Sequence, residues 1–189
     1  MTLKIVRVSA FEDLTIIDLI VNKGVAAVND LPENIKENKN AVAETIENNV
    51  RRLIIDETPT NPKYFEKMSI LLNELIKERK EEAIQYASYL QKIVDFVHKL
   101  KNASATGFYP TAVNTNAKRA LYDNLNYNES LALKVHESII NSKADEWRGS
   151  RIKERQVRNA IRDALDQSQA IDEKTVEAIL ELAKNQNEY

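Results

Sequence analysis

The chain has 189 residues, which is enough to bury one substantial hydrophobic core or two smaller ones. Its composition is 43% hydrophobic and 30% charged, as is typical of a folded protein and not of a disordered one. The 27 basic and 29 acidic residues give a net charge of -2, so the molecule as a whole is not a polyanion binder and any basic site has to be local.

Cysteine content and hydropathy bear on the compartment. The chain has no cysteine, which excludes a disulfide framework and thiolate metal sites and fits a reducing compartment. No apolar run approaches the roughly 18 residues that span a bilayer, and the start, MTLKIVRVSAFEDL, lacks the pattern of a signal peptide. We therefore expect a soluble, cytoplasmic protein with no membrane partner. Only three glycines and four prolines are present, which favours long helices.

The N-terminal third contains three expected elements. Residues 3–8 (LKIVRV) predict a short strand, although their alternation is imperfect. A helix is expected from Ser9 to about residue 22, with Gly24 ending it. A second helical segment follows Pro32 and runs to about residue 56.

The middle of the chain predicts one long helix over residues 62–100. Asn61 and Pro62 form a typical N-cap and first-turn pair. The apolar residues that follow keep helical register, and no glycine or proline interrupts residues 63–101. Such a helix would be roughly 58 Å long at 1.5 Å per residue. A kink or break would fall in KERKEE (77–82), where the apolar pattern has a polar gap.

Glycine, proline and small polar residues then mark a loop at 102–115. It divides the chain into an N-terminal helical part, residues 1–101, and a C-terminal helical part, residues 116–189. Asn128 and Asp172 are suitable N-caps for two of the later helices. The four later helices are expected near 115–125, 128–142, 150–166 and 172–187. The predicted fold class is all-α, with the long helix beside a bundle of shorter ones.

The sequence shows no pattern of an active site. Its three glycines are far apart, whereas a phosphate-binding loop needs them closely spaced. His98 and His136 are the only histidines, and neither belongs to a metal-binding pair or stands near a nucleophilic serine motif. We expect no catalytic residue, no metal ligand and no cofactor in this chain.

The most distinctive feature is a stripe of arginines with spacings of 3, 4, 3 and 4 residues. On a helix this spacing places them along one line, beside an apolar band that includes Val157 and Ile161. Residues 143–162 carry a local net charge of +4, and the single tryptophan, Trp147, precedes the stripe. We call these residues the arginine stripe; they are Arg148, Arg151, Arg155, Arg158 and Arg162.

Three interpretations of the arginine stripe follow from its chemistry. Guanidinium groups bind phosphate, so the stripe could contact DNA. Arginine and tryptophan are also enriched at the energetic centres of protein interfaces, so the stripe and Trp147 could dock another protein. In the third interpretation the arginines brace the fold by pairing with carboxylates on neighbouring helices. The residues alone leave all three open.

Four blocks stand out along the sequence: NNVRRLIIDE (48–57), NPKYFEKMSILLNELIKERKEEAIQYASYLQKI (61–93), YPTAVNTNAKRALYDNL (109–125) and DEWRGSRIKERQVRNAI (145–161). In this order they resemble the C-terminal region of the R (restriction, or motor) subunit of type I restriction–modification enzymes. The closing KNQNEY also resembles the end of such subunits.

This resemblance implies a parent subunit about five times longer, an ATP- and Mg-dependent endonuclease with a nuclease domain and two motor domains. None of the catalytic motifs of those domains occurs here, so the resemblance transfers no catalytic residue. In that family the helical C-terminus is associated with assembly onto the methyltransferase core of modification and specificity subunits. We therefore expect a non-catalytic docking module with residues 145–162 as its contact surface. Contact with DNA, or stabilisation of the motor domains, are the alternatives.

Overall fold

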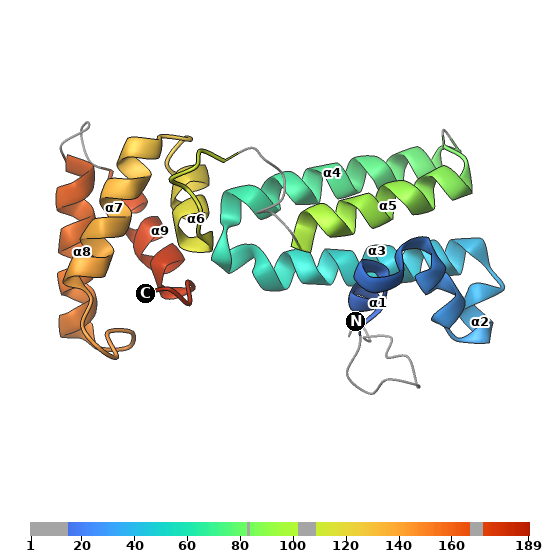
Figure 1. Ribbon diagram of the computed structural model, residues 1–189, viewed down its shortest axis with the longest axis horizontal. Coiled ribbons are helices and arrows are strands. Elements are labelled where there is room, and N and C mark those ends of the chain that lie inside the picture. Colours follow the sequence, from blue (N-terminus) through green and yellow to red (C-terminus); the bar gives the residue numbers. More distant parts are fainter. Residues whose placement is uncertain (1–14, 83, 102–108, 167–171) are drawn as a thin grey trace. The chain divides into compact units, whose positions relative to one another are not determined.

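The computed structural model describes residues 15–82, 84–101, 109–166 and 172–189. Within these ranges the protein is all-α, as predicted, with nine α-helices and two 3-10 helices (Figure 1). The expected strand at 3–8 lies outside the described residues. The chain divides into two compact units: unit 1 contains residues 1–56 and 66–106, and unit 2 contains residues 57–65 and 107–189. Segment 57–65 thus belongs with the C-terminal helices, a grouping that the sequence did not predict.

Unit 1 begins with a helix whose two ends are set by local chemistry. The Thr15 side chain accepts a hydrogen bond from the Asp18 N–H, and the Asp18 carboxylate bonds back to Thr15, forming a capping box. Gly24 ends the helix at φ 58°, which confirms it as the terminator. The helices that contribute to unit 1 are α1 (Ile16–Lys23), η1 (Gly24–Asp30), α2 (Glu33–Lys36), α3 (Lys39–Glu57), α4 (Pro62–Lys80) and α5 (Tyr86–Lys101).

The prediction of a single helix over 62–100 is wrong. Helix α4 ends at Lys80, Glu82 adopts a positive φ of 53°, and α5 starts at Tyr86 and runs alongside α4 (Figure 1). An ion pair of 2.8 Å between Lys92 Nζ and Glu78 Oε2 joins the two helices. The reversal occurs at the end of the charged KERKEE segment, and Leu72 of α4 and Ile93 of α5 are both buried in the core of unit 1.

The core of unit 1 contains one buried ion pair. The Arg79 guanidinium donates to both Glu47 oxygens, at 2.8 and 3.2 Å, and their side chains are only 10% and 6% exposed. The Tyr89 hydroxyl donates to the same carboxylate at 2.9 Å, and Asn40 accepts a further bond from Arg79. The Arg79 guanidinium, the Glu47 carboxylate and the Tyr89 hydroxyl therefore all have partners, which is the condition under which an ion pair is tolerated in a core.

Unit 2 is built from α6 (Asn116–Asn124), α7 (Glu129–Ser142), α8 (Arg151–Asp166) and α9 (Glu173–Lys184), with η2 (Thr58–Thr60) from the earlier segment. The four α-helices lie within two residues of the predicted bounds at all but one end. Asn128 and Asp172 cap α7 and α9 through their side chains, as expected. The Asn61 side chain likewise accepts from the Tyr64 N–H at the start of α4.

The core of unit 2 is continuous from α6 to the last residue described. Val135, Ile161 and Val176 are fully buried, so α7, α8 and α9 meet around one apolar centre. The final segment is part of this unit: the Glu188 carboxylate accepts the Ala117 N–H at 3.0 Å, and Tyr189 is buried at 5% exposure. Within the described ranges no helix combines the length and the apolar character needed to cross a membrane.

Candidate interaction surface

Helix α8 carries most of the arginine stripe, and its start is fixed by a tight turn. Gly149 adopts φ 77°, a conformation that glycine accepts without steric cost. The Gly149 N–H then donates to Glu154 Oε1 at 2.7 Å, so the Glu154 side chain satisfies a donor at the helix entrance. From there Val157 and Ile161 point into the core, and the arginines lie beside them.

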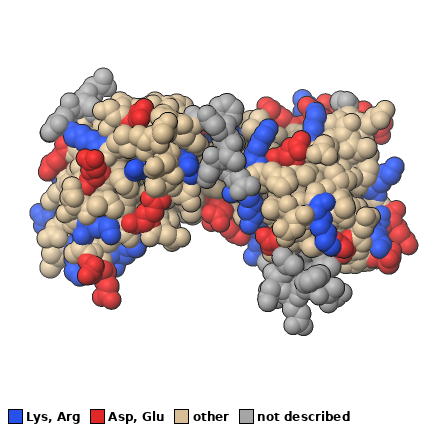
Figure 2. Space-filling view, viewed as in Figure 1, with Lys and Arg blue, Asp and Glu red and all other residues tan. Residues whose placement is uncertain are grey.

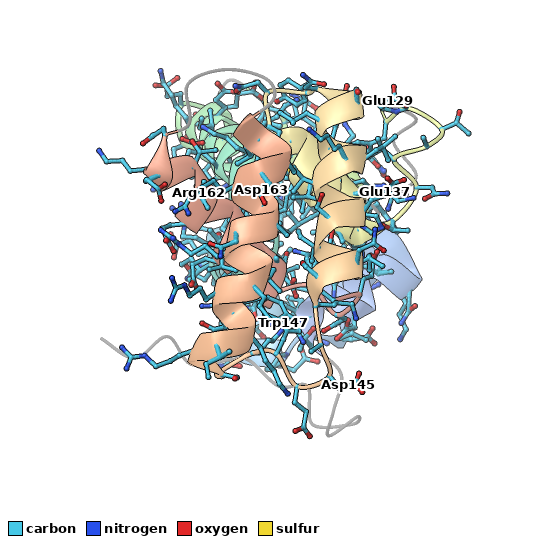
Figure 3. The ribbon with its side chains drawn as sticks, turned by 90° about the vertical axis from the view of Figure 1, so that its left-hand side faces the viewer. Glu129, Glu137, Asp145, Trp147, Arg162 and Asp163 are labelled. Carbon is cyan, nitrogen blue, oxygen red and sulfur yellow. The ribbon has the colours of Figure 1, made fainter. Side chains whose placement is uncertain are left out.

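Trp147 is a core residue. It is 2% exposed, lies beside the start of α8 (Figure 3), and its indole N–H is buried without a hydrogen-bond partner among the described residues. Arg148 covers its ring at 5.3 Å and donates through Nε to the Lys184 carbonyl at 2.8 Å and through Nη2 to the Gln186 carbonyl. In this conformation Trp147 presents no surface to a partner, and Arg148 ties the entry of α8 to the end of α9.

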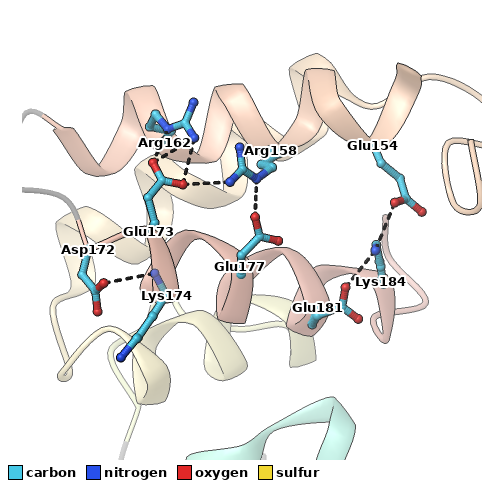
Figure 4. Close-up of polar contacts among 9 residues, drawn as sticks. All are labelled: Glu154, Arg158, Arg162, Asp172, Glu173, Lys174, Glu177, Glu181 and Lys184. Carbon is cyan, nitrogen blue, oxygen red and sulfur yellow. Dashed lines mark hydrogen bonds and ion pairs between the residues drawn. The ribbon is translucent and has the colours of Figure 1, made fainter. Parts of the chain in front are cut away.

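The C-terminal half of the arginine stripe is paired with α9. Arg162 forms two hydrogen bonds of 2.9 Å to the Glu173 carboxylate, and Arg158 reaches Glu173 at 2.8 Å and also Glu177 (Figure 4). The hydrogen bond from Arg162 is the main cause that holds the pKa of Glu173 below its usual value. For Arg158 and Arg162, the structure therefore shows the bracing arrangement.

A second network closes the other end of the α8–α9 pair. Lys184 Nζ lies 3.1 Å from Glu154 and 2.8 Å from Glu181 (Figure 4). The backbone bond from Gly149 and the Lys184 contact lower the pKa of Glu154, in that order of importance. Helix α8 is thus held against α9 at both ends.

Arg151 and Arg155 differ from the other arginines of the stripe, because they have no partner among the residues that the structure describes. Both side chains are exposed, and neither forms a hydrogen bond or an ion pair with any residue in the described ranges. They stand one helical turn apart, so their guanidinium groups can reach the same partner. Of the five arginines, these two remain available for an external contact.

Beside these arginines lies an exposed apolar residue that was not predicted to belong to the surface. Ile152 is 76% exposed, more than any other large hydrophobic side chain in the described part of the chain. The signal was present, because an isoleucine directly after Arg151 falls on the side of the helix opposite Val157 and Ile161. We call Arg151, Ile152 and Arg155 the α8 cluster.

The histidines and carboxylates form no evident chemical centre. His136 Nδ1 shares a 2.8 Å hydrogen bond with the Tyr189 hydroxyl, and burial is the first cause that lowers its pKa, followed by the charge of Lys118. Among the described residues no group of three potential ligands is placed to hold a metal ion. On the face shown in Figure 2, basic and acidic side chains are interspersed, without one continuous basic surface.

Comparisons of the chain with protein-family models, curated proteins and solved structures found no match.

Proposed function

We propose that this chain is a non-catalytic assembly module of a type I restriction enzyme R subunit, which docks the DNA-translocating nuclease onto the methyltransferase core of modification and specificity subunits. The resemblance of the ordered sequence blocks suggests the family. The observation that carries the docking role is the exposure of Arg151 and Arg155 on a helix that is braced at both ends.

The division of the arginine stripe supports a role in assembly. Arg158 and Arg162 form ion pairs with Glu173 on α9, so α8 keeps its position without any contact from Arg151 or Arg155. Two charged side chains that the fold does not use, on a helix already held in place, are suited to an interface because little backbone freedom is lost on binding. The parent subunit would supply ATP- and Mg-dependent catalysis; this chain would supply attachment.

Co-purification provides the direct test. The purified chain is mixed with reconstituted methyltransferase core at physiological salt and analysed by size-exclusion chromatography. We expect a complex that the double variant Arg151→Glu/Arg155→Glu weakens. The control is Arg51→Glu, which removes an exposed arginine from α3 that also has no partner among the described residues. Absence of a complex with the wild-type chain would refute the proposed function.

A second candidate is contact with duplex DNA, which the two exposed guanidinium groups also favour. It predicts binding to duplex DNA that falls steeply as salt rises, because each phosphate contact releases counterions. Titration of the duplex at two salt concentrations, with wild type and Arg155→Ala, distinguishes this candidate from protein docking.

A further inference from the structure

The α8 cluster contains two residues that the stability of the helix does not explain. Arg151 occupies the first position of α8, where the helix dipole disfavours a positive charge. Ile152 exposes most of its side chain to water and lies away from the core. A single exposed isoleucine is ordinary. One placed beside two unpaired arginines, on the first turn of a braced helix, forms a compact surface of mixed apolar and cationic character.

The same surface is poorly suited to a phosphate backbone. A protein that follows a duplex needs many cationic contacts along its path. Further along the stripe, Arg158 and Arg162 are already bonded to Glu173, and Glu177 adds another carboxylate beside them. A duplex extending past the α8 cluster would meet these acids, and Ile152 offers a phosphate no hydrogen bond.

The cluster matches the composition of protein interfaces. In such interfaces an apolar side chain fills a recess, and arginines at its edge form two-pronged hydrogen bonds with carboxylates. Arg155 is the i+3 neighbour of Ile152 on the helix surface, and Arg151 is in turn the i−4 neighbour of Arg155, so both guanidinium groups lie on one side of the isoleucine and can supply that edge. The turn that carries them is fixed beforehand by the Gly149–Glu154 hydrogen bond and by Lys184.

We propose that the α8 cluster binds a protein surface in which carboxylates that pair with Arg151 and Arg155 surround an aliphatic recess for Ile152. The identity of the partner, the methyltransferase core, rests on the function proposed above. Arg158 and Arg162 are positioning residues. They hold α8 on α9 and so place the α8 cluster, but they are not part of the proposed contact. Recognition thus requires the apolar side chain as well as the charges.

Three single variants of the purified chain test this inference: Arg151→Glu, Arg155→Glu and Ile152→Asn. Their affinities for the methyltransferase core are measured by isothermal titration calorimetry. Matched controls are Arg51→Glu for the charge and Ile70→Asn, on α4 and 55% exposed, for the apolar side chain. Circular dichroism melts confirm that every variant is folded. We expect each cluster variant to raise Kd about tenfold or more and each control to leave it nearly unchanged.

The variant Ile152→Asn is decisive because it changes no charge. An unchanged Kd for Ile152→Asn, with weaker binding by both arginine variants, would overturn the aliphatic recess. Binding of the wild-type chain that none of the three variants weakens would overturn this inference and leave the proposed function standing. No binding by the wild-type chain would overturn both. Salt-sensitive binding to duplex DNA that is lost in the arginine variants and kept in Ile152→Asn would overturn protein recognition in favour of phosphate.

Discussion

At the scale of single residues, Glu47 is the shared acceptor of the buried polar cluster in unit 1. Its carboxylate, which is almost fully shielded from solvent, accepts hydrogen bonds from Arg79 and Tyr89. Burial, followed by the charge of Glu47, raises the pKa of Tyr89, and the hydrogen bond with Glu47 raises that of Arg79. Both donors therefore share the Glu47 carboxylate, which carries the negative charge paired with Arg79.

Replacement of Glu47 by alanine would leave the buried Arg79 charge unpaired. We expect Glu47→Ala to lower the free energy of unfolding by about 3–5 kcal/mol, measured by urea denaturation followed by circular dichroism. The control is Glu78→Ala, which breaks the solvent-exposed pair with Lys92 and costs about 1 kcal/mol or less. Equal losses in the two variants would contradict a special role for the buried pair.

Gly149 allows a test of backbone conformation alone. A Cβ atom added at Gly149 meets no atom within 4 Å, so a side chain fits and only the positive φ opposes it. We expect Gly149→Ala to destabilise the protein by about 1–2 kcal/mol. Gly149→Asn should cost less, because asparagine tolerates this conformation better than alanine. Thermal unfolding of the two variants checks the order, and a greater loss for asparagine would contradict it.

At the scale of helices, capping residues in the sequence predicted where helices begin, but the periodicity did not predict the reversal of the chain between α4 and α5. The caps at Asn61, Asn128 and Asp172 depend only on neighbouring residues, so the sequence contains the necessary information. The turn between α4 and α5 does not depend on neighbouring residues alone. Apolar positions keep one register before and after residues 81–85, and periodicity cannot distinguish a straight helix from two helices that pack on each other.

The partners of the arginine side chains could not be predicted from local sequence either. Its alignment along α8 followed from the spacing, but its partners are Glu173 and Glu177, on a helix whose placement depends on tertiary packing. Trp147 was predicted as a possible contact residue, but the structure buries it in unit 2. Neighbouring residues in the sequence do not indicate this burial. Ile152 was detectable as an apolar residue on the polar side of the helix.

The α8–α9 ion pairs predict a dependence on pH. The Glu173 pKa is lower in the folded protein, so its contribution to stability is present above its ordinary value, near 4.5, and is lost as pH falls through the lower folded value. We expect the Tm of wild type to fall more over this acid range than the Tm of Glu173→Gln. The control is Asp163→Asn, an exposed change on α8 that leaves these pairs intact. Parallel acid profiles for wild type and Glu173→Gln would exclude the contribution.

At the scale of the whole molecule, buried and half-buried tyrosines predict alkaline unfolding. Burial is the first cause that raises the pKa values of Tyr64, Tyr89, Tyr109 and Tyr189, to about 12 for Tyr64. The folded state favours their neutral form, so this contribution is complete below pH 10, the ordinary tyrosine value, and decreases as pH rises toward the folded values.

We therefore expect formation of tyrosinate, followed by its absorbance, to coincide with loss of helical circular dichroism above pH 10. Tyr64→Phe should retain helix to a higher pH than wild type, because phenylalanine has no proton to lose. Complete ionisation of all seven tyrosines with the helices still folded would contradict the assignment of buried phenols.

The shielded position of Trp147 makes the protein its own optical reporter. The chain has one indole, and since it lies in the core of unit 2 with a guanidinium over its ring, its emission should be shifted to shorter wavelength than that of tryptophan in water. Arg151 follows only four residues later, so an occupant of α8 that disturbs the entering turn would alter this emission. Affinities could then be read from unlabelled protein, with no dye on the surface under study.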